Sequence, residues 1–381
     1  MGTPLAEIFG EAPWVQELRG FAVRDADQLA TLASSFQGRV ALSQLQAQPK
    51  AEEISRLLAD KAGLAQAASL AAAARQPHGL GYRIPRELSR LRFGDRVERA
   101  AFGFRSSPSD DEIYGAREKA VEAPPTKQEL AALPSRFDLG AITTPVRDQG
   151  FRGTCVAFSA TALLETKLWR DIMIPIDLSE QYVYFLARRN DPDRSMDGTF
   201  PRYAFDGLVA NGACHESFWP YQDFHDWGQS LTFQVPIHNL WMLESDALQR
   251  RVTAYRRVEA SSVAALKAEL FQQRLVCMCV PVFEFAWDLA WSSGEVTLPL
   301  SVPDSQGGEV VFDRIVGGHA ISLCGWVDTP KGRDARPGGG YFIFKNSWSE
   351  RWAAQNTFRP GFGFLPYAYV ERYGFEAYAL E

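Results

Sequence analysis

The sequence predicts an α+β fold, because helical patterns come first in its main part and strand patterns follow. Helical patterns run through CVAFSATALLETKLWRD from Cys155, around residues 200–211 and over residues 263–273. Three later runs, LVCMCVPVF, HAISLCGWV and GYFIFKNSW, are rich in β-branched and aromatic residues, as strands are. Helices and strands that are separated along a chain usually form separate layers of one domain.

Composition divides the 381 residues into three parts. Residues 1–80 read as a small, mainly helical module, in which the run AEEISRLLADKAGLAQAASLAAAAR has acidic residues at its start and Arg75 at its end. Residues 81–132 combine an Arg-rich segment with an extended, Pro-rich linker. The α+β domain is therefore expected over residues 133–381.

The segment of residues 81–132 allows two interpretations. It lies directly before the main domain and its linker is an accessible place to cut, which fits the autoinhibitory segment of a zymogen. Alternatively, the seven arginines between Arg83 and Arg105 form a docking strip for a regulatory protein partner. The sequence alone leaves both interpretations open, a removable autoinhibitory segment and a permanent docking module.

Bulk properties exclude several classes of protein. The net charge of −6 and the pI of about 5.6 provide no basic footprint, so no nucleic-acid partner is expected. The most apolar early run, residues 64–74, is too short for a membrane span, and the first residues lack a signal-peptide pattern. No metal-ligand spacing occurs, so no metal or other cofactor is expected. Five cysteines, an odd number, favour a reducing compartment, and we expect a cytoplasmic location, with non-classical export left open.

Four residues together have the strongest chemical signal. Cys155 follows a glycine-containing turn and precedes a helical pattern, and the dipole at a helix N-terminus lowers the pKa of a thiol. His319 begins a strand pattern after two glycines, and Asn346 follows another strand pattern. Amide hydrolysis needs a nucleophile, a base, a group that orients the base and an oxyanion donor. Together with Gln149, these residues supply one candidate for each role.

The strings around these residues resemble those of the papain family of cysteine peptidases. They are QGFRGTCVAF, LSEQ, GGHAISLCGW and YFIFKNSW, in that order, and the resemblance spans residues 133–371. It implies a two-lobed fold, with Cys155 on a helical lobe, His319 and Asn346 on a β-rich lobe, and the cleft between them. It also implies that Cys155 is the nucleophile, His319 the base, Asn346 the orienting residue, and Gln149 an oxyanion donor together with the backbone N–H of Cys155.

The chain departs from the family pattern close to the nucleophile. Arg152 and Val156 stand where the family has a second cysteine and an aromatic residue, and Ser349 stands where it usually has glycine. The distance along the chain from Cys155 to His319 exceeds the about 130–150 residues typical of the family. We therefore expect extra loop material within residues 287–313 and an unusual substrate cleft.

Three residues are expected to contact substrate. The resemblance implies that Gly198, in SMDGTF, runs along the cleft edge and pairs with the substrate backbone. Gly318, directly before His319, leaves room for a bulky side chain. Trp348 follows Asn346 by two residues and is expected to shield the His319–Asn346 hydrogen bond from water.

The expected function is hydrolysis of peptide bonds in a protein or peptide substrate, through a thioester acyl-enzyme. Endopeptidase and exopeptidase action both fit. The same triad also permits amide or isopeptide transfer, or deamidation, because an acyl-enzyme accepts other nucleophiles. A third reading is a non-catalytic scaffold that binds peptides.

Overall fold

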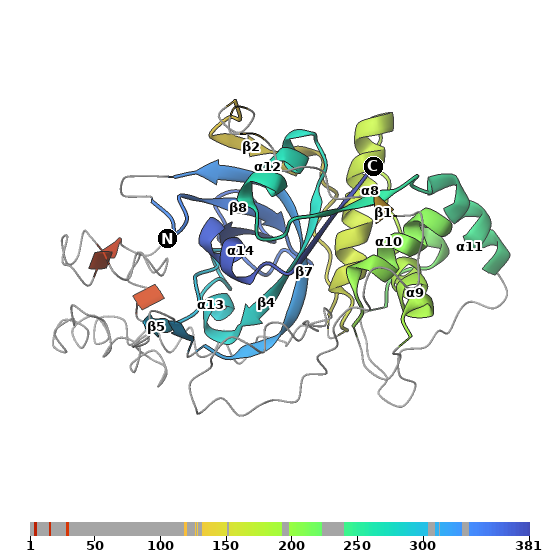
Figure 1. Cartoon of the computed structure of the whole chain (residues 1–381). Helices are drawn as coiled ribbons and strands as arrows, with labels where there is room; N and C mark the ends of the chain where they lie inside the picture. The colour runs from red at the N-terminus through yellow and green to blue at the C-terminus, as the bar shows by residue number, and fades with distance from the viewer. Residues whose placement is uncertain are drawn as a thin grey trace.

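The structure is a computed structural model, drawn in Figure 1. The residues that it describes are 132–150, 152–192, 198–222, 240–303, 309–311, 313–329 and 335–381, together with 4, 5, 15, 16, 28, 29, 118, 119, 126 and 128. Apart from those isolated positions, the predicted module of residues 1–80 and the segment of residues 81–132 lie outside the described residues.

A helical layer forms one side of the domain. Its helices are α8 (Cys155–Ile172), α9 (Glu180–Asn190), α10 (Pro201–Ala210) and α11 (Leu240–Ala247), with 3-10 turns at Gly140–Ile142, Glu216–Phe218 and Leu248–Arg250. The residues of α8 from Cys155 to Thr166 are all buried, as in a helix that is covered on every side. The helix α9 begins where the Ser179 hydroxyl accepts a hydrogen bond from the Tyr182 N–H, and α10 begins with a proline in its first turn.

The second layer is an eight-stranded sheet. In spatial order its strands are β1 (Glu118–Lys119), β3 (Tyr255–Val258), β10 (Glu376–Leu380), β4 (Val276–Phe283), β7 (Ile315–Asp328), β8 (Gly340–Lys345) and β9 (Phe362–Pro366), and β2 (Arg136–Asp138) also pairs with β7. The β1–β3 pair is parallel and the others are antiparallel. The strands β5 (Ser301–Pro303) and β6 (Glu309–Val311) form a separate hairpin.

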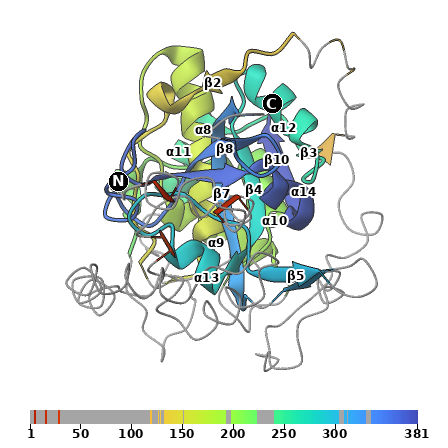
Figure 2. The same cartoon turned by 90° about the vertical axis from the view of Figure 1, so that its left-hand side faces the viewer.

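Both faces of the sheet are covered. The helix α8 packs on one face, and α12 (Val263–Phe271), α13 (Glu284–Asp288) and α14 (Tyr367–Tyr373) lie on the other. Seen from the side of the sheet (Figure 2), β4 and β7 lie in front of α8.

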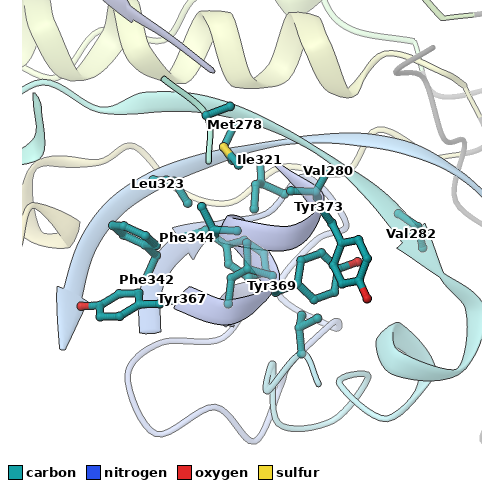
Figure 3. Packing of buried hydrophobic residues seen from close by; sticks show 14 of the residues in the cluster. Met278, Val280, Val282, Ile321, Leu323, Phe342, Phe344, Tyr367, Tyr369 and Tyr373 are labelled. Atoms are coloured by element: carbon teal, nitrogen blue, oxygen red, sulfur yellow. The ribbon is translucent and has the colours of Figure 1, made fainter. Parts of the chain in front are cut away.

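The sequence of β4 explains this arrangement. Neighbouring residues of a strand point to opposite faces. Cys277 and Cys279 accordingly join the core shared with α8, whereas Met278 and Val280 join the core on the α14 side. Figure 3 shows the α14-side core, where side chains of β4, β7 and β8 meet the tyrosines of α14. A strand that is buried on both faces reads as a continuous apolar run, which is what LVCMCVPVF is.

The predicted α+β class is confirmed. The three predicted helices are α8, α10 and α12, and the three predicted strands are β4, β7 and β8. One local prediction is wrong: His319 does not begin its strand, because β7 already starts at Ile315 and pairs with β4 from there. The region of residues 287–313, where extra material was expected, contains the turn after α13 and the hairpin of β5 and β6.

Candidate active site

The thiol of Cys155 lies where the two layers meet. Cys155 is the first residue of α8, and Thr154 is the N-cap. The Sγ of Cys155 lies 3.4 Å from the backbone N of Ala320, the residue that follows His319 on β7. The predicted placement of the thiol at a helix N-terminus is therefore confirmed, and the helix brings it to the strand that carries His319.

The imidazole of His319 is held by Asn346. Its Nε2 lies 2.8 Å from Asn346 Oδ1, which also accepts the backbone N–H of Ser347 at 2.8 Å. An amide oxygen can only accept hydrogen bonds, so Nε2 carries the hydrogen in this pair. In a neutral ring the proton-accepting nitrogen is then Nδ1.

Two tryptophans surround the His319 ring. The Trp348 ring stacks on it, with centroids 4.6 Å apart and planes 25° apart. The Trp287 ring, from α13, meets it edge to face at 5.7 Å. Both indoles lie against the imidazole, and shielding of the His319–Asn346 hydrogen bond by Trp348 stays a prediction. Trp287 was not foreseen, because its contact depends on where α13 packs.

The side chain of Gln149 is fixed at both ends. Its Oε1 accepts the hydroxyl hydrogen of Ser347 at 2.6 Å, and its Nε2 donates to the backbone oxygen of Arg152 at 2.8 Å. The backbone N–H of Gln149 also donates to the Ser347 carbonyl at 2.9 Å. Ser347 thus links Gln149 to Asn346, its neighbour in sequence. Its role was missed, although it lies within the YFIFKNSW string.

The predicted substrate residues have different surroundings. Gly198 adopts a positive φ of 90°, its N–H donates to the Tyr184 hydroxyl at 3.1 Å, and its carbonyl accepts from Arg188 Nη1 at 2.6 Å. A substrate carbonyl that paired with the Gly198 N–H would have to replace the Tyr184 hydroxyl, whereas the Gly198 carbonyl has a second lone pair for a substrate N–H. Gly318 lies opposite Pro281 in the β4–β7 pair and is buried.

A buried pair of opposite charges lies beneath the site. The Thr144 hydroxyl accepts a hydrogen bond from Lys345 Nζ at 2.9 Å and donates one to Glu165 Oε2. Lys345 directly precedes Asn346, and Glu165 belongs to α8, so the pair connects the two layers. Burial raises the pKa of Glu165 and lowers the pKa of Lys345, and each charge opposes the shift of the other.

In the part of the chain that the structure describes, no group of three or more His, Cys, Asp or Glu side chains could hold a metal ion. Among the same residues, no helix is both long enough and apolar enough to span a bilayer. All five cysteines are buried and free of disulfides.

Comparisons with known proteins agree with this geometry. Residues 133–361 match the papain family of cysteine proteases. A senescence-specific cysteine protease of Oryza sativa is 27% identical over 240 residues, which cover 60% of this chain and 58% of that protein. A cathepsin L-like peptidase of Aedes aegypti is 26% identical over 259 residues, which cover 66% of each chain. The chain thus spans less than two thirds of the length of either relative.

Among solved structures, the cysteine protease xylellain of Xylella fastidiosa has a similar fold. The match has a TM-score of 0.56 and 22% sequence identity, and it covers 81% of this chain and 97% of that one. At this identity the similarity demonstrates the shared fold and nothing finer.

Proposed function

Because the chain belongs to the papain family of cysteine proteases, we propose that it hydrolyses peptide bonds with Cys155 as nucleophile, His319 as base and Asn346 as orienting residue. The observation that carries this proposal is the 2.8 Å contact between His319 Nε2 and Asn346 Oδ1, next to a thiol at the start of α8. That pairing makes Nδ1 the proton-accepting nitrogen of the neutral ring.

The reaction begins when Cys155 Sγ gives its proton to His319 and attacks the carbonyl carbon of the substrate. The oxyanion that forms is stabilised by Gln149 Nε2 and the backbone N–H of Cys155. His319 then returns the proton to the leaving amine, and a thioester remains. Water loses a proton to His319 and attacks the thioester, which releases the carboxylic acid and regenerates the thiol.

Cys155→Ala tests the nucleophile, because it removes the sulfur alone. We expect the turnover of a peptide library, measured by mass spectrometry, to fall below about one thousandth of the wild-type rate. Cys214→Ala is the matched control, since burial raises the pKa of that thiol to about 12 and makes it unreactive at neutral pH. Residual turnover above that level in Cys155→Ala would exclude the assignment.

The two other readings are separated by products and by thiol reactivity. If an added amine captures the acyl group in preference to water, the chain is a transferase. If iodoacetamide alkylates Cys155 no faster than free cysteine even after the N-terminal region has been cut off and removed, the chain is a peptide-binding scaffold. Hydrolytic products and rapid alkylation support the peptidase.

We also propose that the N-terminal region restricts access to the site. In the structure Cys155, Gln149 and His319 each expose 0% of their surface, and Leu5 and Val15 of the N-terminal region are equally buried. The exposed, Pro-rich composition before residue 133 makes a cut there plausible, as in a zymogen. Release by a regulatory partner at the arginine strip would give the same result without cleavage.

This regulation is tested on the full chain with a foreign protease site inserted near Pro125. Iodoacetamide labelling of Cys155 is measured before the cut and after removal of the fragment. Faster labelling after the cut supports restriction of access, and spontaneous cleavage near this position supports a zymogen. Equal labelling before and after the cut contradicts both the restriction of access and the zymogen. The interpretation that then remains is a docking strip for a partner protein.

A reducing compartment, such as the cytoplasm, remains our proposal for the location. It is supported by five buried thiols without a disulfide. Fractionation of the native cells, with immunodetection of the chain, tests it.

A further inference from the structure

The loop that carries Gln149 is joined to the helical layer by the side chain of Arg152. The guanidinium carbon of Arg152 lies 5.3 Å from the centroid of the Tyr184 ring and 5.2 Å from that of Tyr221. Its Nη1 donates to Gln181 Oε1 at 2.5 Å and to the carbonyl of Gln222 at 2.7 Å. A planar guanidinium can contact two rings and donate several bonds at once, which an ammonium group cannot match. We call Arg152, Tyr184 and Tyr221 the arginine clamp.

The same clamp residues also hold the backbone of the loop. The Arg152 carbonyl accepts the hydrogen bond from Gln149 Nε2, the group proposed to stabilise the oxyanion. The Tyr221 hydroxyl donates to the Gln149 carbonyl at 2.8 Å and lies 2.7 Å from Thr154 Oγ1. Thr154 is the N-cap of α8, next to Cys155. The Tyr221 hydroxyl thus contacts both ends of the loop, Gln149 at one end and Thr154, directly before the nucleophile, at the other.

The clamp also contacts the backbone of Gly198. The Tyr184 hydroxyl accepts the N–H of Gly198, and Tyr184 belongs to α9. Movement of the Arg152 side chain would therefore release the loop from the helix that also supports Gly198.

We propose that Arg152 is a positioning residue for the oxyanion, because its side chain keeps the amide of Gln149 aimed at the carbonyl oxygen of the substrate. This inference rests on the proposed peptidase function. Oxyanion stabilisation contributes only after the thiolate has attacked a carbonyl. Loss of the clamp consequently slows acyl transfer and weakens binding of analogues that carry an oxyanion, but it leaves the intrinsic reactivity of the thiol intact.

Two probes separate these effects in the full-length protein. Iodoacetamide alkylates Cys155 at a saturated carbon and releases iodide, so no oxyanion forms. A peptide aldehyde is attacked by Cys155 Sγ at its carbonyl carbon, and its oxygen, which becomes the oxyanion or takes the thiol proton, occupies the position of the oxyanion.

The variants are Arg152→Met, which keeps an apolar stem, and Tyr221→Phe, which removes one hydroxyl. For Arg152→Met we expect kcat to fall about 10–100-fold, the scale for a misplaced catalytic donor. The inhibition constant of the aldehyde should rise by a similar factor, while the alkylation rate stays within about twofold. Tyr221→Phe should also lower kcat and raise the inhibition constant of the aldehyde. Arg152→Lys should recover only part of the kcat that Arg152→Met loses.

The matched control is Arg189→Ala. Arg189 also contacts a ring, that of Phe185 at 5.6 Å, and donates to Asn211, but it lies on the exposed side of α9. Arg189→Ala should leave kcat, the inhibition constant of the aldehyde and the alkylation rate unchanged. Thermal melting of each variant verifies folding, and Tyr221→Phe remains an independent test if Arg152→Met does not fold.

Two results overturn the inference while leaving the peptidase function intact. One is unchanged turnover in both Arg152→Met and Tyr221→Phe. The other is an equal loss of alkylation and turnover, which would mean that the whole site had collapsed. If the wild-type protein neither hydrolyses peptides nor binds the aldehyde, both as the full chain and after the cut near Pro125 and removal of the fragment, the proposed function itself fails, and this inference fails with it.

Discussion

Substitution of Lys345 by methionine would leave the carboxylate of Glu165 buried without its counter-charge. Lys345 is 8% exposed and Glu165 is 2% exposed, and the Thr144 hydroxyl lies between them. Methionine has a similar length and no charge, so the change removes the ammonium group with little change of volume. We expect the variant to be less stable at neutral pH, because the hydrogen bonds that Glu165 still accepts from the Thr144 hydroxyl and the Leu178 N–H do not replace the lost counter-charge of a buried carboxylate.

The size of the effect follows from the geometry. Two charges joined through one hydroxyl are about 5 Å apart, and their attraction is about 3 kcal/mol at an effective dielectric constant of about 20. Loss of one partner of a buried ion pair costs about 3–5 kcal/mol in other proteins. We therefore expect the free energy of unfolding of Lys345→Met to fall by about 3 kcal/mol at pH 8.

The pH dependence gives a second, sharper test. Burial already raises the pKa of Glu165, and removal of Lys345 raises it further. Below the pKa of a carboxyl group in the unfolded chain, Glu165 is protonated in both states and its charge no longer matters. As the pH rises above this unfolded-state pKa, Glu165 ionises first in the unfolded chain. The variant therefore loses stability until the pH passes the pKa of Glu165 in the folded state.

Urea unfolding at pH 5 and pH 8 measures both effects, and the double variant with Glu165→Gln closes a mutant cycle. The loss should be smaller at pH 5, and Glu165→Gln should recover part of it at pH 8. A loss that is the same at both values of pH, or no recovery in the double variant, would refute the electrostatic reasoning. Lys267→Met, at a partly buried pair with Asp328, serves as the control and should show a smaller change.

Three more outcomes are expected. His319→Ala should lower kcat more than about 10³-fold and Asn346→Ala less, because a base without its orienting partner still reaches the right pose part of the time; equal losses in peptide assays would contradict this role. Gln149→Ala should slow turnover by about 10²–10³-fold and keep alkylation of Cys155, and an unchanged rate would show that another donor serves the oxyanion. Burial raises the pKa of Asp313 from 3.8 to about 7, so the protonated carboxyl stabilises the fold fully below pH 3.8, and this stabilisation is lost as the pH rises to about 7. The melting temperature of Asp313→Asn should therefore improve relative to that of the wild type between these two pH values. A difference that stays constant with pH would contradict the raised pKa.

The parts of the site that depend on local sequence were predictable. A thiol at the first residue of α8 follows from a turn before Cys155 and an unbroken helical pattern after it. Asn346 follows β8 directly, because GYFIFK is a strand pattern that ends there. The α+β class follows in the same way, since strand and helix periodicities are properties of neighbouring residues. The N-terminal boundaries at residues 80 and 132 remain predictions.

What the tertiary structure decided are contacts between residues far apart in the chain. The sequence reveals that Arg152 departs from the family pattern. The position of Arg152 between Tyr184 and Tyr221, however, requires α9 to pack beside the loop that carries Gln149. Likewise, no pattern indicated that Lys345 faces Glu165 or that the backbone of Gly198 is already bonded. Such contacts follow from how layers pack, and a buried polar group finds its partner across the fold rather than along the sequence. Local patterns determine which elements form, and packing determines which side chains meet.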